Sequence, residues 1–135
     1  MAHGSQLRAK QLELQRTKRE TLFSEFISEA SRLYADALSH KKDDVADMVK
    51  LYAIVSHMRL WASATVIAKA ERVMDDIAAT YLGPNRTLHE MRELAGKGGL
   101  DLLVDFSEAC RDDLADLTWS SRHMGVGRRR VSVRA

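Results

Sequence analysis

The sequence predicts an all-α fold, an antiparallel helical bundle of four main helices plus one short helix, with a long first helix. Apolar residues recur at spacings of three and four along most of the chain, which is the period of an amphipathic helix. One proline, 6% aromatic residues and abundant Ala, Leu, Arg and Glu also favour helix over sheet. Short joints would return successive helices against one another, most simply in up-and-down order.

The first helix is expected at 6–39, and its apolar stripe becomes continuous at Leu22. The stripe comprises Leu22, Phe23, Phe26, Ile27, Ala30, Leu33, Tyr34, Ala37 and Leu38. Upstream it thins to Leu7, Leu12 and Leu14 among charged residues, so residues 6–20 are expected to project as a basic helical extension.

The second helix follows an acidic cap at Asp43 or Asp44 and is apolar around most of its circumference. This predicts a central position in the bundle. We expect one face of Val45, Met48, Val49, Tyr52 and Val55, widened by Leu51, Ile54 and Met58.

Ser63 is the expected cap of the third helix. Gly83 and Pro84 should end this helix, because glycine permits a left-handed cap and proline cannot continue the hydrogen-bond ladder. The expected inner face is Val66, Ile67, Ala70, Val73, Met74, Ile77 and Tyr81.

Thr87 and Glu90 form a capping-box pattern, which predicts a short helix to about Ala95. The glycine-rich joint 96–99 interrupts the chain, and the last helix is expected at 100–119. Its inward residues should be Leu103, Phe106, Cys110, Leu114 and Leu117.

The 135 residues have the size of one domain, which buries about two thirds of its unfolded surface and needs no disulfide or metal. The single cysteine favours a reducing compartment, and no apolar run reaches the roughly 20 residues that span a bilayer. Residues 1–5 resemble a cloning remnant, which would place the natural start further upstream. We therefore divide the chain into this remnant, the extension 6–20, a bundle domain at 21–121 and a basic flexible tail at 122–135.

The net charge of +2 conceals a strong asymmetry. Residues 6–20 carry five basic and two acidic side chains, which gives +3, and residues 122–135 carry five arginines and no acid. The body at 21–121 carries 11 basic and 17 acidic side chains, which gives −6. The chain is thus an acidic domain with two basic ends, and partners would sense each region separately.

The sequence contains no catalytic or metal-binding constellation, and we expect neither an enzyme nor a cofactor. The carboxylate pairs Glu25 with Glu29 and Asp112 with Asp116 lie off the apolar stripes, which indicates solvated side chains. Di-iron bundles need Glu-x-x-His pairs, and the sequence has none.

Neighbouring residues also argue against a zinc protease motif at His89 and a nucleophile at Cys110. His89 is followed four residues later by Glu93 instead of the second histidine of a zinc protease motif. Cys110 has acidic neighbours and an inward helical phase, which indicates a small buried hydrophobe rather than a nucleophile.

The basic extension has two interpretations. A charged helix leading into a compact domain is typical of a segment that follows a membrane-spanning helix on the cytoplasmic side. The residues expected to contact anionic headgroups are Arg8, Lys10, Arg16, Lys18 and Arg19. Leu7 and Leu14 are one heptad apart, so a homo-oligomer through the first helix is the other interpretation, although two repeats do not establish a coiled coil.

The basic tail supports the alternative function, a nucleic-acid-associated protein. Four arginines could neutralise phosphates without reading sequence, namely Arg128, Arg129, Arg130 and Arg134. The acidic body and the lack of interleaved aromatic residues weigh against it, and a solubilising disordered terminus is the simpler interpretation.

Several segments resemble a group of uncharacterised bacterial proteins. They are FISEASRLYADAL at 26–38, LYAI at 51–54 with RL at 59–60, YLGPN at 81–85 with TL at 87–88, and DFSEACR at 105–111. In that group an N-terminal membrane-spanning helix precedes a helical cytoplasmic domain, and no activity is attached to it. The resemblance covers most of residues 20–118 and concerns packing and joint residues. It implies the soluble part of a membrane-anchored protein, although this chain contains no spanning segment.

These patterns together favour a non-enzymatic interaction or scaffolding domain, on the cytoplasmic side of the inner membrane of a bacterium. The protein partner stays undefined, and an anionic membrane surface is preferred to nucleic acid.

Overall fold

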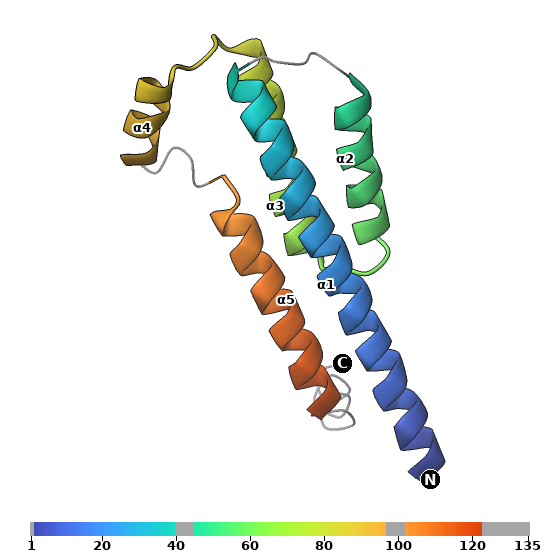
Figure 1. The fold of residues 1–135 in the computed structure, drawn as a ribbon. Helices are drawn as coiled ribbons and strands as arrows, with labels where there is room; N and C mark the ends of the chain where they lie inside the picture. Colours follow the sequence, from blue (N-terminus) through green and yellow to red (C-terminus); the bar gives the residue numbers. More distant parts are fainter. Residues whose placement is uncertain (1, 40–44, 97–101, 123–135) are drawn as a thin grey trace, which may run out of the picture.

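The computed structural model describes residues 2–39, 45–96 and 102–122, and helices account for most of them (Figure 1). In chain order these are α1 (Ala2–Ser39), α2 (Val45–Met58), α3 (Ala64–Leu82), α4 (Leu88–Gly96) and α5 (Val104–Arg122). No strand occurs in the described ranges, so the predicted all-α fold with a long first helix and one short helix is confirmed. α1 runs through the residues that were interpreted as a cloning remnant.

α1 and α3 form the centre of the bundle, and α2, α3 and α5 all pack against α1. α3 packs against α2 and α5 as well, while α4 stands to one side, between the end of α3 and the start of α5 (Figure 1). α1 and α3 run in one direction and α2 and α5 in the other, which confirms the antiparallel bundle. The start of α1 and the end of α5 therefore lie at the same end of the molecule.

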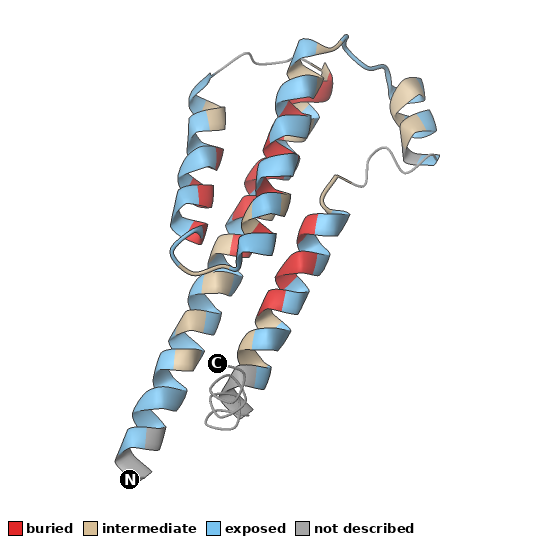
Figure 2. Cartoon of the chain, turned by 180° about the vertical axis from the view of Figure 1, so that it is seen from behind, coloured by how far each residue is buried: buried red, intermediate tan, exposed pale blue. Residues whose placement is uncertain are grey.

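The core forms where the apolar stripes of these four helices meet (Figure 2). The α1 residues in the core cluster recur at spacings of three and four, and they are Phe23, Phe26, Ala30, Leu33 and Ala37. The inner face predicted for α3 is confirmed: Val66, Ala70, Val73, Met74 and Ile77 are buried, and Ile67 and Tyr81 are partly buried. Burial of this apolar surface supplies the main stabilisation of the fold, at about 25 cal/mol per Å².

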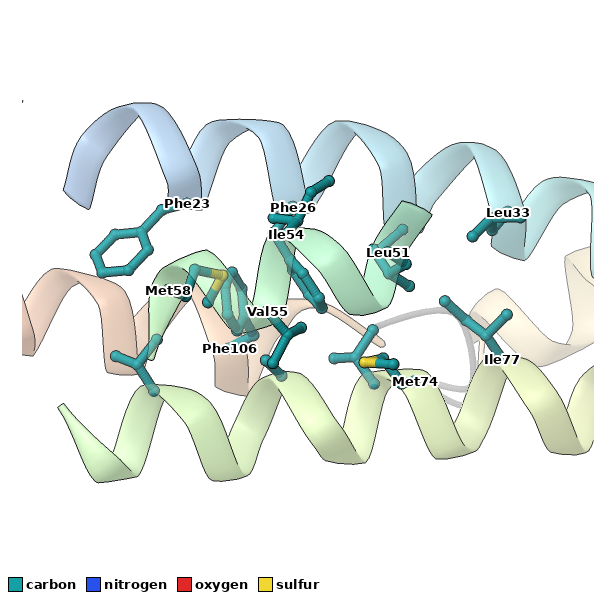
Figure 3. Close-up of a cluster of buried hydrophobic side chains, with 14 of the residues drawn as sticks. Phe23, Phe26, Leu33, Leu51, Ile54, Val55, Met58, Met74, Ile77 and Phe106 are labelled. Carbon is teal, nitrogen blue, oxygen red and sulfur yellow. The ribbon is translucent and has the colours of Figure 1, made fainter. Parts of the chain in front are cut away.

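Three phenylalanines join α1 to α5 in the core (Figure 3). The ring centroids of Phe26 and Phe106 are 4.5 Å apart with a tilt of 38°, and Phe23 meets Phe106 edge-on at 6.3 Å. Both arrangements avoid the repulsive face-to-face stack and add to the energy of burial. Phe106 and Cys110 are buried, and Leu103, Leu114 and Leu117 are partly buried, so the inward face predicted for the last helix is confirmed.

The prediction that α2 is central was wrong. α2 lies at one side of the bundle, where it packs against α1 and α3. Its buried residues are Leu51, Ile54, Val55 and Met58. Three residues of the predicted principal face, Val45, Val49 and Tyr52, are exposed. α2 carries two overlapping apolar stripes, and two neighbours cover only one of them.

The joints follow local chemistry with one difference. Ser63 caps α3, since its hydroxyl accepts a hydrogen bond from the Val66 amide at 3.3 Å. At the other end Gly83 has φ −85° and ψ 178°, so its backbone is extended and the predicted left-handed cap was wrong. Its N–H donates to the Thr80 carbonyl at 3.2 Å, which closes the helix without a positive φ.

Thr87 and Glu90 form the predicted capping box at the start of α4. The Glu90 amide donates to the Thr87 hydroxyl at 3.2 Å, and the Thr87 amide donates to the Glu90 carboxylate at 3.4 Å. The expected acidic cap of α2 and most of the 96–99 joint lie outside the described residues.

Candidate functional site

The two basic segments, which are far apart in sequence, converge on one end of the bundle (Figure 1). The N-terminal part of α1 lies beside the C-terminal part of α5, where Arg16 Nη1 donates to the Thr118 hydroxyl at 2.7 Å and to the Leu114 carbonyl at 3.3 Å. Arg122 is the last residue of α5, so the tail 122–135 starts at this same end. The tail arginines Arg128, Arg129, Arg130 and Arg134 lie outside the described residues.

The structure divides the five basic residues of the extension into two groups. Arg8, Lys10 and Lys18 have exposed side chains. Arg16 and Arg19 contact α5, although the Arg16 side chain is still 45% exposed. The projecting extension is thus shorter than predicted, because Arg16 already contacts α5.

Two of these exposed residues, Lys10 and Lys18, share one face of α1 with two leucines. With 3.6 residues per turn, positions 7, 10, 14 and 18 fall on one side of the helix, away from the buried positions 19, 23 and 26. Leu7 is 52% exposed and Leu14 is 54% exposed. We call Leu7, Lys10, Leu14 and Lys18 the arm face. It combines apolar and cationic side chains and points away from the bundle.

Asp113 is a buried carboxylate that the sequence analysis missed. It is 4% exposed, and it forms an ion pair with Arg19 across the α1–α5 contact. Its other carboxylate oxygen accepts a hydrogen bond from the Ser63 amide at 2.9 Å, at the start of α3. One side chain therefore joins three helices. The sequence signal was available, because position 113 lies on the stripe 106–110–114–117 and position 19 lies four residues before Phe23.

Arg19 is less completely satisfied than its partner. Its side chain is 16% exposed, and its Nε is buried without a hydrogen-bond partner among the described residues. The guanidinium thus neutralises a buried charge at this contact, and a lipid headgroup could not reach it without displacing Asp113.

Glu29 corrects a second prediction, because it is 8% exposed rather than solvated. Its carboxylate pairs with Arg32 at 2.5 Å and with Lys50 of α2 at 3.7 Å. Arg32 also contacts Asp36 at 3.3 Å and Asp47 of α2 at 3.2 Å. The hydrogen bond that Arg32 donates to Glu29 raises the pKa of the guanidinium above its ordinary value; partial burial opposes this shift, and Asp47 adds to it. The network joins α1 to α2, and its charged side chains pair with one another.

A groove of about 810 Å³ runs along α1 beside α2. Its α1 residues follow the arm face in the sequence. Hydroxyl and carboxylate groups dominate its lining, which consists of Glu20, Thr21, Ser24, Glu25, Ser28, Glu29, Lys50 and Ile54. Glu20 pairs with Arg16 at 2.8 Å, whereas Glu25 is exposed. This groove is acidic, in contrast to the basic arm face. Glu25, Asp112 and Asp116 are exposed, so the expectation of solvated carboxylates holds for these three.

Three side chains weighed as reactive groups can be placed among the described residues, namely Cys110, His57 and His89. Burial, followed by the nearby Asp113 charge, raises the pKa of the Cys110 thiol to about 12, so the nucleophilic thiolate is suppressed. His89 is exposed and lies 3.3 Å from Glu93, and His57 is exposed as well. Within the described ranges no three His, Cys, Asp or Glu side chains are grouped as metal ligands would be.

Comparisons with known proteins do not add to this description of the site. No family model, curated protein or solved structure matches the chain. Across residues 2–39, 45–96 and 102–122, no helix combines the length and low polarity that crossing a bilayer requires. The resemblance of residues 20–118 to membrane-anchored bacterial domains stays a prediction.

Proposed function

We propose that this chain is a non-enzymatic helical interaction domain that attaches to an anionic membrane surface through the basic end of its bundle. The observation that carries the proposal is the arm face, where Leu7 and Leu14 alternate with Lys10 and Lys18 on a helix surface turned away from the core. Helix binding at the membrane interface draws on both contributions, because leucines enter the acyl boundary and cations are attracted to anionic headgroups. The anionic cytoplasmic leaflet of a bacterium is the surface that fits the charge.

The magnitudes favour weak, reversible attachment by the arm face alone. Each basic residue near an anionic surface contributes about 1 kcal/mol, which gives about 2 kcal/mol for Lys10 and Lys18. Each half-exposed leucine adds about 1 kcal/mol when its remaining surface leaves water. A total of about 4 kcal/mol corresponds to a dissociation constant on the order of 1 mM.

The tail strengthens this attachment because it starts where the arm face lies. Arg122 ends α5 beside the basic part of α1, and four more arginines follow in sequence within the next twelve residues. Two cationic segments tethered to one end of a rigid bundle act on one surface together, which raises affinity without a new contact. The acidic groove lies further along α1 and would be kept away from the same surface.

Vesicle flotation tests the proposal with the full chain. We expect the protein to float with vesicles containing phosphatidylglycerol at low salt, and to stay in solution with phosphatidylcholine alone or at high salt. Lys10→Glu with Lys18→Glu should reduce binding at least tenfold. Arg72→Glu, an exposed charge reversal on α3, should leave it nearly unchanged and is the matched control.

Two results would overturn the proposal. One is the absence of flotation on anionic vesicles at low salt. The other is retention of duplex DNA in a mobility shift that requires the tail, combined with no vesicle binding. That second result would favour the nucleic-acid alternative. We prefer the membrane because exposed leucines have no role in neutralising a phosphate backbone.

A further inference from the structure

The outward side of α1 has two halves of opposite character. The first half is the arm face, with two leucines and two lysines. The second half is the acidic groove, where Thr21, Glu25 and Ser28 continue the same heptad spacing beyond Lys18. Ile54 of α2 supplies an apolar wall to this groove. A single helix therefore presents a cationic, leucine-bearing surface and, one to two turns later, an anionic concavity.

These two halves are complementary to each other only in one orientation. A parallel second copy would place lysines over lysines and carboxylates over carboxylates, which is unfavourable. An antiparallel second copy places Leu7, Lys10 and Leu14 of each arm face over the other chain's groove, while the two Lys18 residues lie beside each other at the two-fold axis. A pairing that sets Lys10 opposite Glu25 also sets Leu14 opposite Thr21 and Leu7 opposite Ser28, so the larger side chains meet smaller ones.

We infer that α1 pairs with α1 of a second copy of this chain in an antiparallel, two-fold symmetric dimer. Lys10 of each chain contacts Glu25 of the other, and Leu7 and Leu14 enter the opposite groove against its hydroxyl-bearing wall. Each contact occurs twice in the dimer, because the two-fold axis relates identical surfaces. Arg16 and Arg19 take no part, since they face α5 on the other side of the helix.

The size of this contact sets its strength. The paired segment from position 7 to position 28 is about 33 Å long at 1.5 Å per residue. A two-helix contact of this length falls at the lower end of specific interfaces, which is typical of weak, reversible association. The arm face cannot bind lipid while it is covered by a second copy. The dimer thus goes beyond the proposed membrane attachment and competes with it.

Charge reversal tests the pairing in solution, without vesicles. Sedimentation velocity of the full chain should show a concentration-dependent monomer–dimer equilibrium. Glu25→Lys and Lys10→Glu should each weaken the dimer at least tenfold, because each places like charges together at two symmetric contacts. Glu108→Lys, which reverses an exposed charge on α5, is the control and should leave the dimer unchanged.

Mixing the two reversed variants is the decisive step. A Lys10→Glu chain and a Glu25→Lys chain are complementary to each other only if positions 10 and 25 face one another in an antiparallel pair, so the mixture should recover a dimer. A protein that is monomeric at every concentration would overturn the inference, as would a dimer that neither reversal weakens or a mixture that stays monomeric. Glu25→Lys should retain vesicle binding, so loss of the dimer and loss of membrane attachment are separable.

Discussion

Replacing Asp113 by alanine should destabilise the bundle more than any other single change at a charged position. The substitution removes the ion pair with Arg19 and the hydrogen bond from the Ser63 amide, so it loosens α5 from α1 and from the start of α3 together. It also leaves a mostly buried guanidinium without its counter-charge. Breaking a buried pair in this way costs about 3–5 kcal/mol.

The lower end of that range applies here because Arg19 keeps partial access to water. A loss of about 3 kcal/mol is a large fraction of the roughly 5–15 kcal/mol that stabilises a typical domain. Urea unfolding followed by far-ultraviolet circular dichroism measures it. Asp112→Ala, the exposed neighbour on the same helix, should change the unfolding free energy by no more than about 0.5 kcal/mol.

A double substitution distinguishes the loss of the Arg19–Asp113 ion pair from the cost of leaving one of its charges buried without a partner. Arg19→Met with Asp113→Leu should be more stable than either single alanine variant, because no unpaired charge remains buried. The unsatisfied Arg19 Nε indicates that the native pair is itself incompletely compensated. The reasoning is refuted if Asp113→Ala behaves like Asp112→Ala, or if the two sites show no coupling.

Three other substitutions or reactions test separate parts of the structure. Val55→Ala should lower the free energy of unfolding in urea by about 1–3 kcal/mol, because Val55 is buried. Val49 is 58% exposed, so Val49→Ala should lower it by no more than about 0.5 kcal/mol. Equal effects would contradict the observed face of α2. Thr87→Ala should weaken the α4 cap by about 1 kcal/mol and speed amide exchange within α4, while the urea midpoint of the whole domain stays constant. Cys110 should react with a thiol reagent at pH 8 at least about 100-fold more slowly in the native protein than in urea, because a pKa of about 12 leaves roughly one thiolate in 10⁴ molecules. Because that pKa is raised from 9.0 on folding, the thiol favours the folded state up to about pH 9 and this contribution is lost as the pH rises toward 12; a Cys110→Ala variant should lose this part of the pH dependence.

Much of the fold could be predicted because the determining interactions are local or periodic. The Ser63 cap and the Thr87–Glu90 capping box depend on residues three apart, so their geometry is nearly independent of the rest of the chain. The inner face of α3 was equally clear, because α3 carries one apolar stripe and a polar remainder. Where a helix carries a single stripe, burial has one solution.

α2 shows where periodicity stops being sufficient. Both the Val45–Val49–Tyr52 face and the Leu51–Val55–Met58 face are apolar, and sequence cannot choose between them. The choice depends on how many neighbours α2 has and on which side they lie. Asp113 and Glu29 present the same difficulty for charges, because a carboxylate is buried only where a cation from another helix meets it.

The sequence by itself determined the helices, the N-terminal caps of α3 and α4, the main apolar stripes and the separation of an acidic body from two basic ends. These features follow from spacings within a few residues and from composition. Only the tertiary structure decided that both basic ends lie at one end of the bundle, that Arg16 and Arg19 hold α5 while Lys10 and Lys18 face outward, and that Asp113 joins three helices. Such features depend on contacts between residues about 50 to 100 positions apart, and helical period alone carries no information about which distant surfaces meet.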